Sequence, residues 1–212
     1  MDTREKERTK VLVVFYSMYG NTAKLAKAVA EGSRQVENVE VFLRQVEELM
    51  PEEVIEANER MKRVKKELAG IPIATNEDLV EADGIVFGSP TRYGNMSAQM
   101  KQFIDKTGNL WAEGKLINKV AGVFTSTSSL HGGQETTIIT SMIPLLHHGM
   151  IIVGVPYSEQ RLFSLEFGGG SPYGASSVSG PNADRSPTEN DLEIAKTLGR
   201  RVAEIAKKMT GK

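Results

Sequence analysis

The sequence has no cysteine among its 212 residues, and only three histidines and one tryptophan. Without cysteine it offers no disulfide, no thiolate metal ligand and no thiol nucleophile, and with so few histidines we expect no metal site. An excess of one charge is also missing. The chain has 26 Lys and Arg residues and 27 Asp and Glu residues, which gives a formal net charge of −1. We therefore expect no broad positive field that would attract nucleic acid.

Long hydrophobic runs are absent as well. No apolar stretch approaches the roughly 18 residues that cross a bilayer, and the charged N-terminus MDTREKERTK lacks the apolar core of a secretory signal. These absences predict a cytoplasmic protein that binds neither membrane nor nucleic acid. Hydrophobic residues nevertheless make up 40% of the chain, enough for a folded core.

Five short apolar runs, rich in β-branched residues, are typical of buried parallel strands. Helical patterns lie between them, and strands that alternate with helices predict an α/β fold with a parallel sheet. We expect a doubly wound sheet with helices on both faces. The predicted strands are Val11–Tyr16, Val39–Leu43, Gly84–Gly88, Lys119–Phe124 and Met150–Val155.

The predicted helices are Asn21–Glu31, which Gly32 would stop, Ser97–Thr107, Gln134–His147 and a last helix after a capping box at 186–189. Residues 1–212 would form a single domain with two additions. One is an insertion at about 47–80 with one amphipathic helix and a solvated charged face. The other is a Gly/Ser/Pro-rich segment at about 157–187, whose length as a loop is unusual.

Polar loops follow the first, third and fourth predicted strands, and the carboxyl ends of parallel strands share the edge where ligands bind. The first loop has hydroxyls at both ends, a glycine and a helix start behind it, a combination suited to phosphate. It contains no Lys or Arg, so hydroxyls and dipoles alone would hold the anion. An equally good alternative is that its hydroxyls only cap the turn. The residues of this loop are Ser17, Met18, Tyr19, Gly20, Asn21 and Thr22.

The two other loops bring an aromatic residue, an arginine, hydroxyls and glycines to the same edge. Three such loops together predict a phosphorylated aromatic cofactor, with its phosphate on the first loop and its ring between the others. The second loop contains Pro90, Thr91, Arg92, Tyr93, Gly94 and Asn95. The third contains Ser126, Thr127, Ser128, Ser129, Leu130, His131 and Gly132.

The first loop resembles the Ser/Thr-x-Thr-Gly-x-Thr phosphate loop of flavodoxins, with Tyr19 in place of the middle Thr. The stretches YSMYGNT, SPTRYGNMSAQMKQFIDKTGNLW, GGQE, HHGM and SPYGAS resemble the WrbA-type NAD(P)H:quinone oxidoreductases, and the resemblance runs from about Val11 to Ala206. It implies a flavodoxin-like strand order of 2-1-3-4-5. The loop after the fourth strand departs from the family pattern, because it is one residue longer and poorer in glycine.

The resemblance implies tightly bound FMN, NADH or NADPH as cosubstrate, and two-electron reduction of quinones by ping-pong hydride transfer through the flavin. It matches the residues of all three loops, together with His147, to FMN contacts. It matches Tyr19 and Trp111 to the nicotinamide or quinone. From the residues alone, His147 is more often structural. For Trp111 the alternative is a residue of the core or of a subunit contact.

The family forms homotetramers, and we expect residues 157–187 to become ordered at a subunit contact. The main alternative function is a flavodoxin-type electron carrier without a substrate of its own. Carriers of this fold are typically shorter and strongly acidic, which this chain is not. A further alternative is an interaction protein that keeps the fold but binds no FMN. No residue can be assigned to the ribose of the cosubstrate, so NADH and NADPH both stay open.

Overall fold

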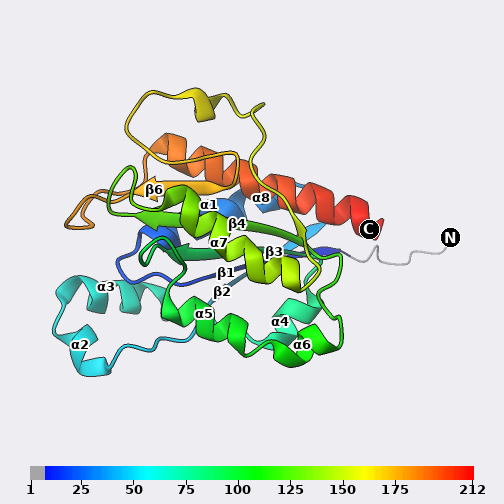
Figure 1. Cartoon of the computed structure of the whole chain (residues 1–212), viewed down its shortest axis with the longest axis horizontal. Helices are drawn as coiled ribbons and strands as arrows, with labels where there is room; N and C mark the ends of the chain where they lie inside the picture. The colour runs from blue at the N-terminus through cyan, green and yellow to red at the C-terminus, as the bar shows by residue number, and fades with distance from the viewer. Residues whose placement is uncertain (1–7) are drawn as a thin grey trace.

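The sheet occupies the centre of the computed structural model, which describes residues 8–212 (Figure 1). Its main path runs β2-β1-β3-β4-β5, all in parallel pairs, which confirms the predicted order. The strands are β1 (Thr9–Phe15), β2 (Val39–Gln45), β3 (Gly84–Pro90), β4 (Val120–Thr127) and β5 (Ile151–Ile152). Side chains on both faces of β1, β3 and β4 are buried, as expected for central strands.

The prediction of only five strands was wrong, because a sixth strand lies inside the Gly/Ser/Pro-rich segment. Strand β6 (Ala175–Val178) pairs in parallel with Phe124–Thr127 of β4, while β5 pairs only with Val120 and Ala121. Two segments therefore share one edge of β4. All four residues of β6 are buried, so this part of the 157–187 segment packs within its own chain.

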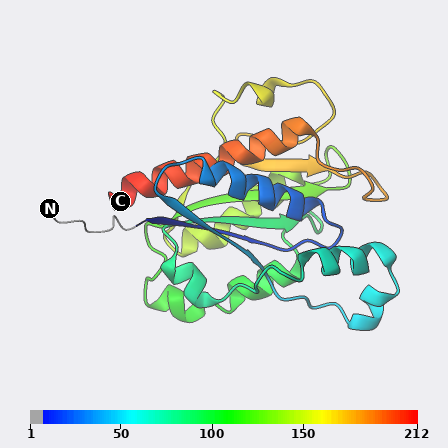
Figure 2. The same cartoon turned by 180° about the vertical axis from the view of Figure 1, so that it is seen from behind.

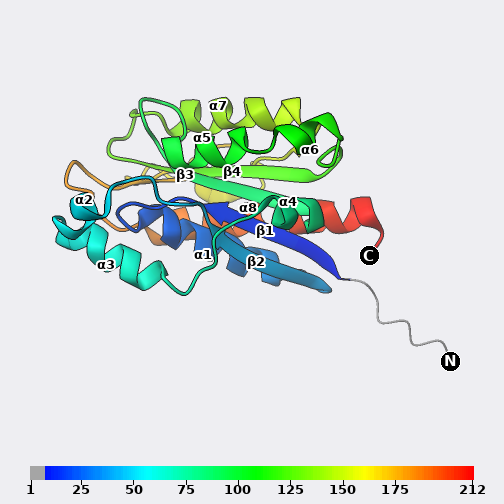
Figure 3. The ribbon, with the colours of Figure 1, turned by 90° about the horizontal axis from the view of Figure 1, so that it is seen from below.

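Helices cover both faces of the sheet (Figures 2 and 3). Helices α1 (Asn21–Arg34) and α8 (Glu189–Thr210) pack on one face and share a core with Val11, Val13 and Phe15. The other face packs a second core around Leu12 and Val14. The helices on that face are α4 (Asn76–Glu81), α5 (Ala98–Asp105), α6 (Gly108–Ala112) and α7 (Gln134–His147). No helix in residues 8–212 is long and apolar enough to cross a bilayer.

Gly32 lies inside α1, so the prediction that it ends the helix was wrong. The helix continues to Arg34, and Gly32 faces the backbone of α8: a β-carbon there would lie 2.0 Å from the Lys196 carbonyl oxygen. Gly199 of α8 meets α1 in the same way. Glycine at these positions therefore permits close helix packing.

The capping box of α8 lies two residues later than predicted. Thr188 is the N-cap, and its hydroxyl accepts the Asp191 amide while the Asp191 carboxylate accepts the Thr188 amide. The other oxygen of this buried carboxylate accepts the Gly169 amide at 2.7 Å. A contact with the Gly-rich segment thus selects Thr188 over Ser186.

The 47–80 insertion contains the predicted amphipathic helix, α3 (Glu59–Leu68), which buries Met61, Val64 and Leu68 and exposes its charged side chains. It also contains the short helix α2 (Glu52–Glu56) and leads into α4. Figure 3 places α2 and α3 at the end of the sheet opposite α6. The insertion therefore lies beside the carboxyl ends of the strands.

Candidate functional site

The loop from β1 to α1 is shaped by the hydroxyl of Ser17. Its oxygen accepts the amides of Gly20 and Ala23 at 3.2 and 3.1 Å, and Gly20 takes a positive φ of 95° that favours glycine. The amides of Met18, Tyr19, Asn21 and Thr22 have no acceptor among the described residues. The loop thus presents backbone amides without hydrogen-bond acceptors at a helix N-terminus, an arrangement that suits an anion.

Buried hydroxyls connect this loop to the end of β4. Thr22 Oγ1 and Ser126 Oγ lie 2.8 Å apart. Asn21 donates through Nδ2 to the Arg185 carbonyl at 2.8 Å, whereas its Oδ1 is buried without a partner. An orphaned buried acceptor beside uncommitted amides is consistent with a site built for a ligand with both hydroxyl and phosphate groups.

The loop after β3 ends in a tight turn over residues 92–95. The Arg92 amide donates to the Asn95 carbonyl at 2.7 Å, and Tyr93 and Gly94 have positive φ values of 54° and 77°. Positive φ at both central residues is the pattern of a type I′ turn. The turn holds the Tyr93 side chain fully exposed, and a non-glycine residue with such a backbone often marks a functional site.

Arg92 reaches back toward the first loop. Its guanidinium donates to the Thr91 carbonyl at 2.8 Å and approaches the Met18 sulfur at 3.5 Å. The Thr91 hydroxyl accepts the Gly94 amide and the Thr137 hydroxyl, which ties the turn to α7. The second loop is therefore supported from both sides and rigidly placed beside the first.

The loop after β4 begins beside the other two loops and then becomes exposed to solvent. Thr127 is buried, and its hydroxyl donates to the Ser129 carbonyl at 2.8 Å. Ser128 through Gly132 are exposed, and Gly133 begins α7 with φ of 104°. The start of this loop lies beside the other two, and at its end a β-carbon on Gly133 would lie 3.0 Å from Gly94 Cα and from Thr91 Oγ1 of the second loop.

A cavity of about 120 Å³ lies where the three loops meet. The predicted residues that line it are Ser17, Met18, Tyr19, Asn21, Thr22, Pro90, Thr91, Arg92, Ser126, Thr127 and Ser128. Sequence reasoning missed a fourth wall, made by Ser179, Pro181 and Ala183. These belong to residues 179–186, which we call the covering segment. Its only sequence signal was the turn-rich SGPNAD stretch, too far along the chain to place without the structure.

A buried polar cluster anchors the insertion beneath the first loop. The Tyr16 hydroxyl donates to the Glu48 carboxylate at 2.9 Å, and Gln99 Nε2 donates to both groups at 3.1 and 3.0 Å. Burial raises the pKa of the Tyr16 phenol, and the charge of Glu48 raises it further, so this donor stays protonated. The cluster fixes the chain leaving β2 against the end of β1.

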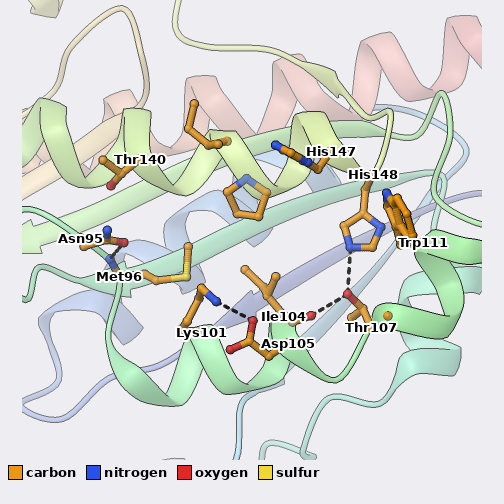
Figure 4. A pocket seen from close by; sticks show the side chains of 13 residues that line it. Asn95, Met96, Lys101, Ile104, Asp105, Thr107, Trp111, Thr140, His147 and His148 are labelled. Atoms are coloured by element: carbon orange, nitrogen blue, oxygen red, sulfur yellow. Dashed lines mark hydrogen bonds and ion pairs between the residues drawn. The ribbon is translucent and has the colours of Figure 1, made fainter.

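Trp111 and His147 do not join the cavity of this chain. Both lie in a separate groove of about 600 Å³ between α5, α6 and α7 (Figure 4). Figures 1 and 3 place α6 and the end of α7 at the amino ends of the strands, away from the first loop. Asn95 and Met96 line the same groove, so it extends back toward the second loop.

His148, next to His147, is the structural histidine of the pair. Its Nε2 lies 2.8 Å from the Thr107 hydroxyl, and that hydroxyl donates to the Ile104 carbonyl, so Nε2 carries the hydrogen (Figure 4). Burial lowers the pKa of His148, and the neighbouring His147 lowers it further. Among residues 8–212, no group of three or more His, Asp or Glu side chains could hold a metal ion.

The sheet order, the donor-rich loop at the start of α1 and the loops beside it define a flavodoxin-like α/β protein. Residues 9–159 match the model of the NADPH-dependent FMN reductase family, and the chain belongs to this family. The resemblance to WrbA-type proteins is confirmed.

Relatives named NAD(P)H dehydrogenase (quinone) match almost the whole chain. The one from Aromatoleum aromaticum is 52% identical over 93% of this chain and 95% of its own length. The one from Methanosarcina acetivorans is 50% identical over 96% and 99%. Among solved structures, a WrbA-like flavodoxin from Agrobacterium tumefaciens superposes with a TM-score of 0.64 at 25% identity, covering 94% of this chain and 98% of that one.

Proposed function

We propose that this protein is an FMN-dependent NAD(P)H:quinone oxidoreductase that reduces quinones to hydroquinones by two electrons. The observation that carries the proposal is the set of uncommitted amides of the Ser17–Thr22 loop, which lies beside the Arg92 turn at the carboxyl edge of the sheet. Relatives about 50% identical that are named NAD(P)H dehydrogenase (quinone) support the same activity.

The residues present fit FMN. The amides and hydroxyls of the first loop would hold the phosphate, and the orphaned Asn21 Oδ1 would accept a hydroxyl of the sugar-alcohol chain. Thr91, Arg92 and the Tyr93–Gly94 turn would contact the ring, with the third loop opposite. When bound, FMN supplies the hydride-accepting and electron-donating chemistry, while the protein orients it and excludes water.

The proposed order of turnover is ping-pong. One exposed edge, beside Tyr19 and the fully exposed Tyr93, would serve the nicotinamide and the quinone in turn, because both are planar and stack on aromatic side chains. The oxidised nicotinamide then has to leave before the quinone enters. Overall, NAD(P)H, a proton and the quinone give NAD(P)⁺ and the hydroquinone.

Steady-state oxidation of NADH and of NADPH by FMN-loaded protein, with benzoquinone as acceptor, tests this function. We expect turnover without a partner reductase, parallel double-reciprocal plots and a bleached flavin spectrum when the reductant is added anaerobically. Protein without FMN is the control. Negligible turnover by yellow protein would instead support the electron-carrier alternative, and colourless protein that takes up no FMN would support an interaction protein.

We also propose a homotetramer in which a second copy brings Trp111 and His147 to the flavin. Within one chain, α6 with Trp111 and the end of α7 with His147 lie at the opposite end of the sheet from the first loop, so we expect both to reach the flavin across a subunit interface. Large apolar side chains are exposed in the groove, elsewhere on α7 and in the first part of the 157–187 segment, as an interface requires. They include Trp111, Ile139, Ile143, Leu146, Phe163 and Leu165.

Light scattering at micromolar concentration should give the mass of four chains. Ile143→Asp, which puts a charge on the exposed face of α7, should shift the mass toward smaller species because burying that charge is costly. Met209→Asp is the matched control, since Met209 is similarly exposed but lies on α8. A monomeric wild-type protein would contradict the assembly and leave the activity open.

A further inference from the structure

Helix α3 of the insertion rests on the first loop through one face. Val64 lies so close to Gly20 that a β-carbon on the glycine would be 3.3 Å from Val64 Cγ2. One turn earlier on the same face, Arg60 donates through Nε to the Tyr19 carbonyl at 3.2 Å. Its guanidinium also lies 5.8 Å from the centre of the Tyr19 ring. The insertion therefore brings a permanent positive charge against a loop that contains none.

The same guanidinium also holds the covering segment. Arg60 Nη1 donates to the Asn182 carbonyl at 3.2 Å, so one side chain connects the first loop to the segment that forms the fourth wall of the cavity. Both acceptors are neutral carbonyls, and no carboxylate among the described residues lies within ion-pair distance of Arg60. Its charge is therefore not cancelled by an ion pair.

Three other cations near the loop have hydrogen-bond partners of their own, and Lys65 lines a neighbouring pocket with Ser17 and Met18. Lys24 donates to the Ser186 hydroxyl, and Arg185 stacks on the Phe167 ring while donating to the Phe167 carbonyl. Arg92 donates to the Thr91 carbonyl of the second loop and to the Met18 sulfur of the first. Arg60 is the cation among these that donates to a backbone carbonyl of the first loop.

We propose that Arg60 is a positioning residue that makes the site selective for a phosphorylated flavin. The guanidinium engages the Tyr19 and Asn182 carbonyls, while the loop amides without acceptors stay available for the anion. The positive charge adds attraction for a phosphate dianion that the uncharged loop does not provide. The inference rests on the proposed function, because it concerns how the same site binds FMN.

The test compares the affinities of FMN and riboflavin, which differ only in the phosphate, by quenching of flavin fluorescence. Arg60→Met keeps the length of the side chain and removes its charge. We expect it to weaken FMN about tenfold while riboflavin affinity stays within about twofold, and the loss should shrink in roughly 1 M salt. Arg60→Lys keeps the charge, so it should retain most of the preference for FMN.

Arg63→Met is the matched control, because Arg63 is exposed on the same helix and, within the described part of the chain, pairs only with Glu67 at 3.8 Å. It should bind both flavins as the wild type does. Equal weakening of FMN and riboflavin in Arg60→Met would overturn the proposal, as would no weakening, or an Arg60→Lys variant as weak as Arg60→Met. Failure of the wild type to bind FMN would be a different result, since it would refute the proposed function itself.

Discussion

Replacing Gly199 with alanine is expected to destabilise the folded protein by about 3 kcal/mol or more. A β-carbon at this position would lie 2.0 Å from the Val29 carbonyl oxygen and 3.0 Å from the Ser33 hydroxyl oxygen. The first contact is with backbone, which no side-chain rotation relieves. Helices α1 and α8 would have to separate, and the core they share with β1 would lose packing.

Urea unfolding and thermal melts at one fixed protein concentration measure this effect, since association also changes stability. For a chain of this length, the melting temperature should fall by about 10 °C. Gly70→Ala is the matched control, because a β-carbon there meets nothing within 4 Å. If the Gly199→Ala and Gly70→Ala proteins unfold at the same urea concentration, the close contact between the two helices is not what the structure indicates.

Replacing Ser17 with alanine is expected to weaken FMN binding about 30-fold, since hydrogen bonds to charged groups are among the stronger ones. The Ser17 oxygen accepts the amides of Gly20 and Ala23, and its hydroxyl hydrogen has no acceptor among residues 8–212 and is available to donate to phosphate. Alanine removes this donor and also leaves the Gly20 and Ala23 amides without their acceptor. The loop would then lose both a ligand contact and the bonds that hold its shape.

Fluorescence titration with FMN measures the loss, and riboflavin shows how much of it concerns the phosphate. Ser164→Ala is the matched control, because the Ser164 hydroxyl also accepts a backbone amide, that of Glu166, but lies outside the cavity. Unchanged FMN affinity in Ser17→Ala would show that this hydroxyl only caps the turn, the alternative that sequence left open.

Much of the architecture follows from local patterns. Apolar runs such as VLVVF can be satisfied only by burial on both faces, so β1 was predictable within two residues. The 3.6-residue repeat of α8 identifies the side that packs on the sheet, where Leu198 and Val202 are fully buried. The first loop was predictable because hydroxyls, a glycine and a helix start stood together in one short stretch.

Other features depended on contacts between distant segments. The stretch ASSV has no hydrophobic pattern, and it is a strand because the end of β4 has an open edge beside it. The predicted capping box began at Ser186, and the contact of Gly169 with Asp191 places it at Thr188 instead. Gly32 resembled a stop signal because nothing near it in sequence shows that α8 crosses there.

The composition and the order of apolar runs by themselves determined a parallel α/β sheet with a donor-rich loop at its carboxyl edge, because burial and helix capping act over a few residues. Tertiary structure alone decided that Arg60 lies against that loop and that residues 179–186 cover it. It also decided that Trp111 and His147 lie on helices at the opposite edge of the sheet. These positions depend on how segments more than 40 residues apart pack together, and local sequence patterns do not predict such packing.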